Sequence, residues 1–314
     1  MDGEAGVKTA AKFQHKERTA AGELRAEVPL ARLETLWINT GTLCNVECAH
    51  CYIKSSPTND RLVYLSAEEA APFLDEARRM GAREIGFTGG EPFLNPDMIA
   101  MTQGALTRGF NVLILTNAMR PMMRPKVQEG LLSLRARFPH LLTLRVSLDH
   151  YSAEGHDAER GEGAFEASMT GLGWLQDNGF SFTIAGRGLT GEREAELRSG
   201  FAALFEARGV PLDAHDPAQL VIFPEMDAAR DVPEITAACW SILGKDQADM
   251  MCATSRMLVK RKGAERPAVL SCTLLPYDEQ FEMGKSLAEA AKPVKLNHPF
   301  CAQFCVLGGA SCSG

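Results

Sequence analysis

The sequence lacks any long apolar run. Nowhere in its 314 residues does it approach the ~20 consecutive apolar residues that a membrane-spanning helix needs. The first 35 residues mix charged residues with Ala and Gly, and they lack the roughly 7–15-residue apolar core of a secretory signal peptide. We therefore expect a cytoplasmic protein with no membrane partner.

Long basic runs are also missing. The longest is Lys260-Arg261-Lys262, and the formal net charge is −7, so we expect no nucleic-acid partner. Internal repeats and low-complexity segments are absent too. With 45% hydrophobic and 23% charged residues, the composition is that of a folded globular protein and excludes the disordered and fibrous classes.

Cysteine, in contrast, is plentiful. A cytoplasmic protein keeps its thiols reduced, so nine cysteines indicate metal sites or catalysis rather than disulfides. Three cysteines crowd into one segment and five fall within the last 63 residues. The ninth, Cys239, lies in an apolar, helix-like context that predicts a small buried residue.

Short apolar runs alternate with longer amphipathic ones from residue 36 onward. The apolar runs predict strands at residues 36–40, 84–88, 111–116, 142–147, 181–184 and 219–223. The amphipathic runs predict helices at residues 66–80, 96–108, 124–137, 164–177 and 192–207, the first with a capping box of Ser66 and Glu69. This alternation predicts the α/β class: a parallel sheet or incomplete barrel with helices outside. Ligands of such folds bind beyond the carboxyl ends of the strands.

The alternation breaks after about residue 230. We expect a helix over residues 234–243, two short β-like runs at 257–260 and 268–271, and then a cysteine-rich tail. The predicted organisation is a flexible N-terminal segment over residues 1–34, a barrel over 35–230, and a tail region over 231–314.

The most specific motif follows the first predicted strand. Cys44, Cys48 and Cys51 form a C-x3-C-x2-C pattern. Three such thiolates hold three corners of an iron–sulfur cube and leave one iron open to bind a small molecule, whereas closed clusters take four cysteines. The alternative is a zinc site with His50 as the fourth ligand. We favour the cluster, because zinc sites usually combine paired C-x2-C elements.

A second motif, Gly89-Gly90-Glu91-Pro92, directly follows the second predicted strand. Two glycines leave the backbone bare, so that a ligand can approach it closely. Glu91 then offers a carboxylate to a cationic group such as an ammonium. Taken alone, the same four residues are also compatible with a simple turn.

Together, at this spacing, the two motifs resemble the radical S-adenosylmethionine (SAM) superfamily over about residues 36–224. The resemblance implies a partial (β/α)6 barrel and a [4Fe–4S] cluster whose open iron binds the amino and carboxylate groups of SAM. Glu91 with Gly89 and Gly90 matches the motif that holds the methionine ammonium. An electron donor such as flavodoxin or ferredoxin would reduce the cluster. The resulting 5′-deoxyadenosyl radical would abstract hydrogen from a peptide or small-molecule substrate.

The resemblance also suggests further residues around SAM. Ser147 and Asp149 end the fourth strand, where family members bind the ribose, although Ser147 also suits a plain strand-end cap. An arginine would pair with the SAM carboxylate, although each candidate also suits a surface ion pair. The remaining positions implied are Thr116, Asn117, Arg160 and Arg187.

The tail cysteines resemble the abbreviated auxiliary-cluster extension called a twitch domain, a shortened relative of the SPASM domain. The full SPASM cysteine set is absent. Five thiols suit one second [4Fe–4S] cluster with one to spare, and Cys312 is the weakest candidate ligand. A structural zinc clamp is the alternative. The five are Cys252, Cys272, Cys301, Cys305 and Cys312.

The expected function is thus that of a radical SAM oxidoreductase. One alternative is a radical SAM methyltransferase that uses Cys239 or the spare tail thiol as methyl carrier. Another is a non-catalytic iron–sulfur scaffold or electron carrier. Glu91 and its neighbouring glycines argue against this second alternative, since a scaffold or electron carrier needs no binding site for an amino acid.

Overall fold

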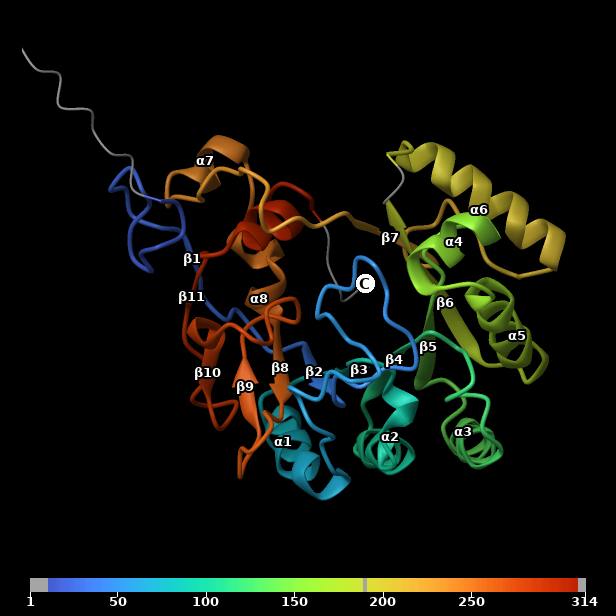
Figure 1. Cartoon of the computed structure of the whole chain (residues 1–314). Coiled ribbons are helices and arrows are strands. Elements are labelled where there is room, and N and C mark those ends of the chain that lie inside the picture. The colour runs from blue at the N-terminus through green and yellow to red at the C-terminus, as the bar shows by residue number, and fades with distance from the viewer. Residues whose placement is uncertain (1–10, 189–190, 310–314) are drawn as a thin grey trace, which may run out of the picture.

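A computed structural model describes residues 11–188 and 191–309. Its centre is a curved sheet of nine strands in the order β10-β9-β8-β2-β3-β4-β5-β6-β7 (Figure 1). Seven strands from β8 to β7 run parallel, and β9 and β10 add antiparallel pairs at one edge. The strands are β2 (Thr35–Asn39), β3 (Glu84–Thr88), β4 (Asn111–Thr116), β5 (Leu142–Ser147), β6 (Ser181–Gly188), β7 (Leu220–Pro224), β8 (Ser255–Val259), β9 (Ala268–Leu270) and β10 (Glu282–Gly284).

Helices cover one face of the sheet and leave its other face to the loops (Figure 1). They are α1 (Ala67–Arg79), α2 (Met98–Thr107), α3 (Pro125–Arg137), α5 (Ala164–Asp177) and α6 (Glu194–Arg208). The predicted α/β class is therefore confirmed. The capping box of α1 is also present, because Ser66 accepts from Glu69 N and the Glu69 carboxylate accepts from Ser66 N.

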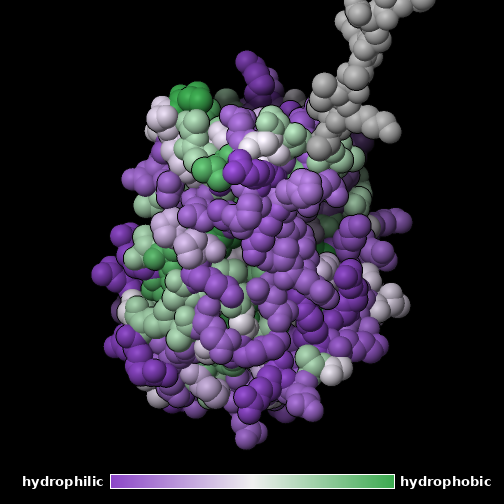
Figure 2. Space-filling view, turned by 90° about the vertical axis from the view of Figure 1, so that its left-hand side faces the viewer, coloured by the Kyte–Doolittle hydropathy of each residue, from purple (hydrophilic) through white to green (hydrophobic). Residues whose placement is uncertain are grey.

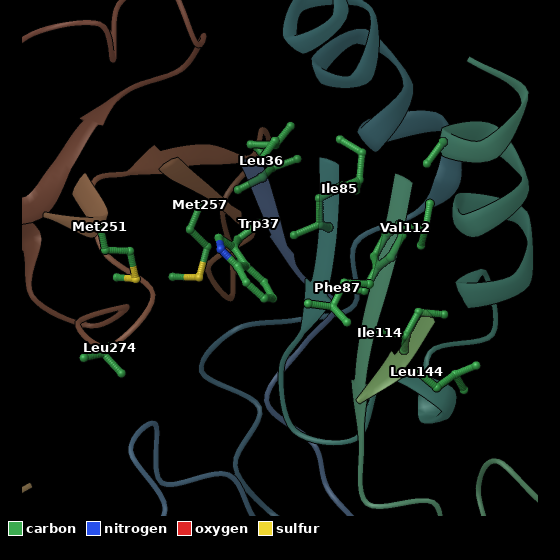
Figure 3. Close-up of a cluster of buried hydrophobic side chains, with 14 of the residues drawn as sticks. Leu36, Trp37, Ile85, Phe87, Val112, Ile114, Leu144, Met251, Met257 and Leu274 are labelled. Atoms are coloured by element: carbon green, nitrogen blue, oxygen red, sulfur yellow. The ribbon is translucent and has the colours of Figure 1, made fainter. Parts of the chain in front are cut away.

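Alternation along the strands decides what lies on each face. Buried aliphatic side chains such as Leu36, Ile85, Ile114 and Leu144 pack against the helices in the main core (Figure 3). The register places the intervening residues on the inner face, where Trp37 aligns with Gly86 of β3. This inner face holds the cavity described below, so the strands carry core residues and site residues in alternation.

The tail continues the sheet of the barrel. Strand β8 pairs in parallel with β2, and β9 and β10 follow it. The remaining short elements are β1 (Glu27–Val28), β11 (Val294–Lys295), α4 (Ala153–Arg160), α7 (Cys239–Leu243), α8 (Met251–Thr254), η1 (Pro92–Leu94), η2 (Gln247–Asp249), η3 (Glu279–Phe281) and a π-helical turn, η4 (Cys301–Val306). Helix α4 was not expected from the sequence; Ser152 caps it by accepting from Gly155 N.

The described part of the N-terminal segment packs on the tail. Strand β1 pairs with β11, and Arg25 is buried in an ion pair of 2.6 Å with Glu234. Glu234 also accepts from the backbone of Phe13 and Ala20. These contacts hold residue 234 outside a helix, so the helix expected from residue 234 begins only at Cys239, which is half-buried.

The outer face on the tail side is mainly hydrophilic, with smaller hydrophobic areas between the polar side chains (Figure 2). Apolar residues of the tail region such as Leu270, Phe281 and Val294 are buried beneath this surface. Across the described ranges, no helix has both the length and the apolar composition needed to span a membrane.

Candidate functional site

The cluster-motif cysteines lie on the loop between β2 and α1, at the carboxyl edge of the parallel strands. Cys44 is buried, Cys48 and Cys51 are half-buried, and all three line one cavity. Burial raises the pKa of Cys44 to about 12 and also raises the pKa of Cys48. Such thiols lose their protons readily only when a cation such as iron replaces them, so their environment suits metal-bound thiolates.

Gly89 and Gly90 are the contact points between β3 and the cluster loop. Gly90 N donates to Gly41 O at 2.8 Å, and Glu91 N donates to Leu43 O at 3.1 Å. A Cβ on Gly90 would lie well under 3.0 Å from Leu43 O, and one on Gly89 would collide with Gly41 O. The sequence suggested glycine for the sake of a ligand. In the structure both residues line the cavity, but the nearest group that excludes a side chain is the loop backbone itself.

Glu91 is buried below the ends of β3 and β4, with 2% of its surface exposed, and is not among the residues that line the cavity. Its Oε1 accepts from Thr116 Oγ1 at 2.8 Å and Phe93 N at 3.2 Å, and its Oε2 accepts from Asn117 N at 2.9 Å. Burial raises the pKa of this carboxyl, and these hydrogen bonds oppose the rise. Since each carboxylate oxygen accepts two hydrogen bonds, Oε2 retains room for one further donor.

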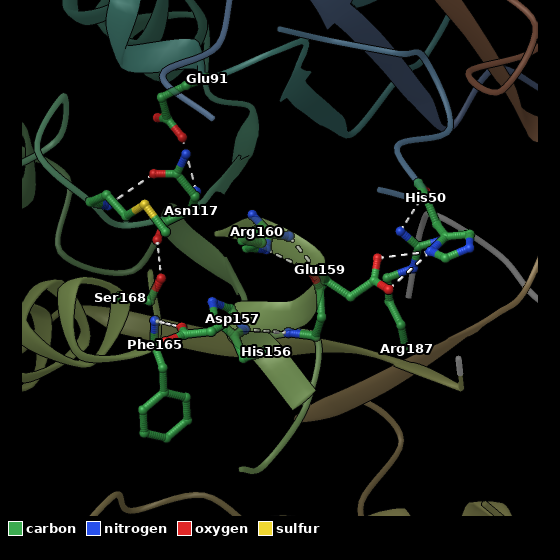
Figure 4. Close-up of polar contacts among 12 residues, drawn as sticks. His50, Glu91, Asn117, His156, Asp157, Glu159, Arg160, Phe165, Ser168 and Arg187 are labelled. Atoms are coloured by element: carbon green, nitrogen blue, oxygen red, sulfur yellow. Dashed lines mark hydrogen bonds and ion pairs between the residues drawn. The ribbon is translucent and has the colours of Figure 1, made fainter. Parts of the chain in front are cut away.

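Asn117, at the end of β4, contacts both Glu91 and Ser168 (Figure 4) and also links β4 to the cluster loop. Its Nδ2 donates to Asn45 Oδ1 at 2.9 Å, and its carbonyl oxygen accepts from Ser168 Oγ of α5 at 2.9 Å. Thr116 and Asn117 both line the cavity. The structure therefore brings these two residues, Glu91 and the cluster loop into one hydrogen-bonded unit.

Asp149 and Arg160 form a buried bidentate pair beside the same cavity. Arg160 Nε donates to Asp149 Oδ2 at 2.6 Å, and Nη2 donates to Oδ1 at 3.0 Å. Burial alone would raise the pKa of Asp149, but the Arg160 guanidinium outweighs it and lowers this pKa. His156 Nδ1 accepts from Asp149 N at 3.1 Å and orients the residue further. Ser147, at the end of β5, lines the cavity beside this pair.

Arg187 differs from Arg160, because no carboxylate holds it within the described residues. It projects from the inner face of β6, donates from Nη1 to His50 O at 2.6 Å, and lies over the Tyr52 ring with Cζ 4.5 Å from its centroid. Its Nε is buried and has no hydrogen-bond partner in the described structure. Arg187 thus lines the cavity with a donor available.

Helix α4 also contacts the cluster loop, through Glu159, a residue that the sequence analysis did not identify. Glu159 accepts from Ala49 N through its carbonyl at 2.9 Å, and its carboxylate contacts His50 Nδ1 at 2.9 Å (Figure 4). Glu159 lies next to Arg160, a position that the resemblance to the family implied. That proximity was the only available signal, because the contact joins segments 109 residues apart.

Four tail cysteines surround a second, smaller cavity. Cys252 comes from α8, Cys272 follows β9, and Cys301 and Cys305 lie on η4. Burial raises the pKa of Cys272 and Cys301 well above the usual value, and neighbouring cysteines raise both further. The other lining residues are largely apolar, among them Met251 and Phe281. Cys312, the fifth candidate, lies outside the described residues.

The two cavities share a lining residue. Leu274, two residues after Cys272, lines the barrel cavity and the tail cavity. Among residues 11–188 and 191–309, no three His, Cys, Asp or Glu side chains are grouped so that one metal ion would bind all of them.

The fold and this site define the class of protein: an α/β protein with an incomplete parallel barrel and a three-cysteine loop at the mouth of its cavity. The model of the Radical SAM superfamily matches residues 38–199, about half of the chain, and the chain belongs to this superfamily. Proteins of this superfamily bind SAM and a [4Fe–4S] cluster.

Curated relatives share the barrel region. The AdoMet-dependent heme synthase of Methanosarcina barkeri is 32% identical over 145 residues, which cover 45% of this chain and 38% of the relative. The mycofactocin maturase MftC of Mycolicibacterium smegmatis is 29% identical over 169 residues, or 54% of this chain and 41% of the relative. The chain therefore matches less than half the length of these relatives.

Similarity to solved structures extends further along the chain. The structure of Streptococcus suis SuiB bound to S-adenosylmethionine superposes with a TM-score of 0.59 and 13% identity, covering 81% of this chain and 63% of SuiB. At this identity the match shows a shared fold.

Proposed function

We propose that the chain is an oxidoreductase that cleaves SAM reductively and abstracts a hydrogen atom from its substrate. The observation that carries the proposal is the convergence of Cys44, Cys48 and Cys51 with the Glu91 network and Arg187 on one cavity. Bound together, the cluster and SAM supply a 5′-deoxyadenosyl radical and methionine upon one-electron reduction by a donor such as flavodoxin or ferredoxin.

Several polar groups that line the cavity, together with the buried Glu91 next to it, would hold SAM. The three cysteines bind three irons and leave the fourth to the cofactor. The remaining acceptor site of Glu91 Oε2 suits the methionine ammonium, and Thr116 and Asn117 fix its direction. Ser147 and Asp149 would bind the ribose of SAM, and Arg160 orients Asp149 through its hydrogen bonds.

Of the two arginines, Arg187 is the better partner for the SAM carboxylate. Arg160 already binds Asp149 with two hydrogen bonds, whereas Arg187 keeps a buried Nε donor without a partner in the described structure. A buried donor of this kind is favoured to meet an acceptor, because leaving it unpaired is costly.

The remaining lining keeps water away from the reaction. Trp37, Leu115 and Phe223 give the inner face an apolar surface around the polar groups. A dry cavity protects a reactive radical from side reactions and strengthens the ionic contacts that orient SAM.

For the tail we propose a second [4Fe–4S] cluster bound by Cys252, Cys272, Cys301 and Cys305. In a four-iron cluster each thiolate binds a different iron, whereas one zinc ion must bring all its ligands together. Four thiols around one largely apolar cavity suit such a cluster. With all four irons bound by thiolates, such a cluster would supply electron transfer rather than substrate binding. Leu274 lines the cavities of both cysteine sets.

A peptide is the favoured substrate class. SuiB has also been solved bound to its precursor peptide SuiA, and it aligns with 82% of this chain at a TM-score of 0.57. MftC, a maturase by name, is among the relatives of the barrel region.

Product analysis tests the proposal. Reduced, anaerobically reconstituted protein should convert SAM to 5′-deoxyadenosine and methionine, and the variant with Cys44, Cys48 and Cys51 all replaced by Ala should not. S-adenosylhomocysteine should stay a minor product. If it dominates, and disappears in Cys239→Ala or Cys312→Ala, the protein is a methyltransferase and our assignment is wrong.

A further inference from the structure

Arg256 is a buried arginine whose guanidinium contacts the backbone of one tail cysteine, Cys252. It lies on β8 with 1% of its surface exposed. Its guanidinium donates to four backbone carbonyls: Ala290 at 2.8 Å, Cys252 at 2.6 Å, Ser255 at 2.7 Å and Lys292 at 3.2 Å. These contacts use four of its five N–H donors, and none of them supplies a negative charge to balance its positive charge.

A buried arginine normally pairs with a carboxylate, because an isolated charge is costly to remove from water. Arg25, which also lies near the tail site, follows this rule through its ion pair of 2.6 Å with Glu234. Arg256 does not: no carboxylate forms an ion pair with it in the part of the chain that the structure describes. An arginine guanidinium keeps its positive charge in proteins, so Arg256 is a buried cation.

We propose that Arg256 is the counter-cation of the tail cluster and sets its reduction potential. This inference rests on the second cluster proposed above. A [4Fe–4S] cluster with four thiolate ligands is anionic, and its one-electron reduction adds a further negative charge. A nearby buried cation stabilises the reduced form more than the oxidised form, so it raises the potential.

This role also explains why four backbone carbonyls surround the Arg256 guanidinium. The four carbonyls come from α8, β8 and the 290–292 segment, and together they hold the guanidinium against the backbone of Cys252. Cys252 lies four residues before Arg256, on the segment that leads into β8. A more positive potential lets the cluster accept an electron from a substrate radical more readily.

The test measures the tail cluster alone, in the full-length chain with Cys44, Cys48 and Cys51 replaced by Ala. After anaerobic reconstitution, a reductive titration followed by electron paramagnetic resonance gives its midpoint potential. Arg256→Gln and Arg256→Met should make the cluster at least tenfold harder to reduce, a shift of about −59 mV or more for one electron. Arg256→Lys, which keeps the charge, should retain most of the original potential.

Arg145→Met is the matched control. Arg145 is also buried, with 5% exposure, but it lies on β5 and contacts Thr183 of β6. Its replacement should leave the potential unchanged. Iron content and thermal unfolding of each variant separate a charge effect from a loss of structure.

Each outcome decides between the claims. A loss of cluster in both neutral variants, with Arg256→Lys retaining it, supports the counter-cation. An unchanged potential in Arg256→Gln with full iron overturns it while leaving the second cluster intact. If Arg256→Lys behaves like the neutral variants, Arg256 acts only as a structural staple and the inference is wrong. Absence of tail iron while Arg256 is intact overturns the second cluster itself.

Discussion

At the scale of single residues, Glu91 shows how one side chain serves structure and chemistry together. Three hydrogen bonds from Thr116, Asn117 and Phe93 fix its carboxylate. Truncation to Ala would leave these buried donors unpaired, so it would disturb the fold as well as the ligand site. A replacement that keeps the shape and removes the charge is therefore the sharper probe.

Glu91→Gln should weaken SAM binding about tenfold to a hundredfold, because a charge-assisted hydrogen bond contributes about 1.5–3 kcal/mol. Iron content should not change. Equilibrium binding of SAM to the reconstituted protein measures the effect. Glu84→Gln is the control, since Glu84 begins the same strand at the opposite edge and contacts Thr35. Unchanged affinity in Glu91→Gln would mean that Gly89-Gly90-Glu91-Pro92 serves only as a turn.

At the scale of elements, the backbone at the end of β3 packs directly against the backbone of the cluster loop, with no side chain between them. The sequence pattern placed glycine at residues 89 and 90, but the reason is a contact with Gly41 and Leu43 that joins two strand ends. A side chain there would push the loop away from β3, and the cysteines would move with it.

Gly90→Ala should therefore lose most of the iron bound by the barrel cysteines. Gly104→Ala is the matched control, because a Cβ at Gly104 meets nothing closer than 3.6 Å and α2 should gain about 0.5–1 kcal/mol. Iron assays after anaerobic reconstitution, with thermal unfolding of both proteins, compare the two variants. Full iron in Gly90→Ala would contradict the proposed contact.

At the scale of the whole molecule, the barrel and the tail share one sheet. Strand β8 lies against β2, the strand that leads into the cluster loop, and Leu274 stands between the two cavities. The two sets of cysteines nevertheless come from separate segments and line separate cavities. Each set should therefore bind its metal without the other.

The intact protein should bind about eight irons, from two four-iron clusters. Replacing Cys44, Cys48 and Cys51 with Ala should leave about four, and replacing Cys252 and Cys272 should also leave about four. Iron and zinc assays on reconstituted protein decide the result. Zinc retained in equimolar amount by the first variant would indicate a structural zinc site in the tail. Full iron there would exclude the barrel site.

The sequence by itself determined the local features. Apolar periodicity placed six strands and five helices, and short spacing placed Cys44, Cys48 and Cys51 on one loop. These features depend on neighbours in the chain, which a sequence pattern records. Helix α4 and the late start of α7 were missed, because α4 spans only eight residues and Glu234 is held by the N-terminal segment.

Only the tertiary structure decided how distant segments meet. It paired Arg160 with Asp149 and left Arg187 with a buried Nε donor that has no partner in the described structure. It also joined β8 to β2 and buried Arg256 against the backbone of Cys252. Such contacts depend on register and on burial, and these arise only when strands far apart in the chain pack into one sheet.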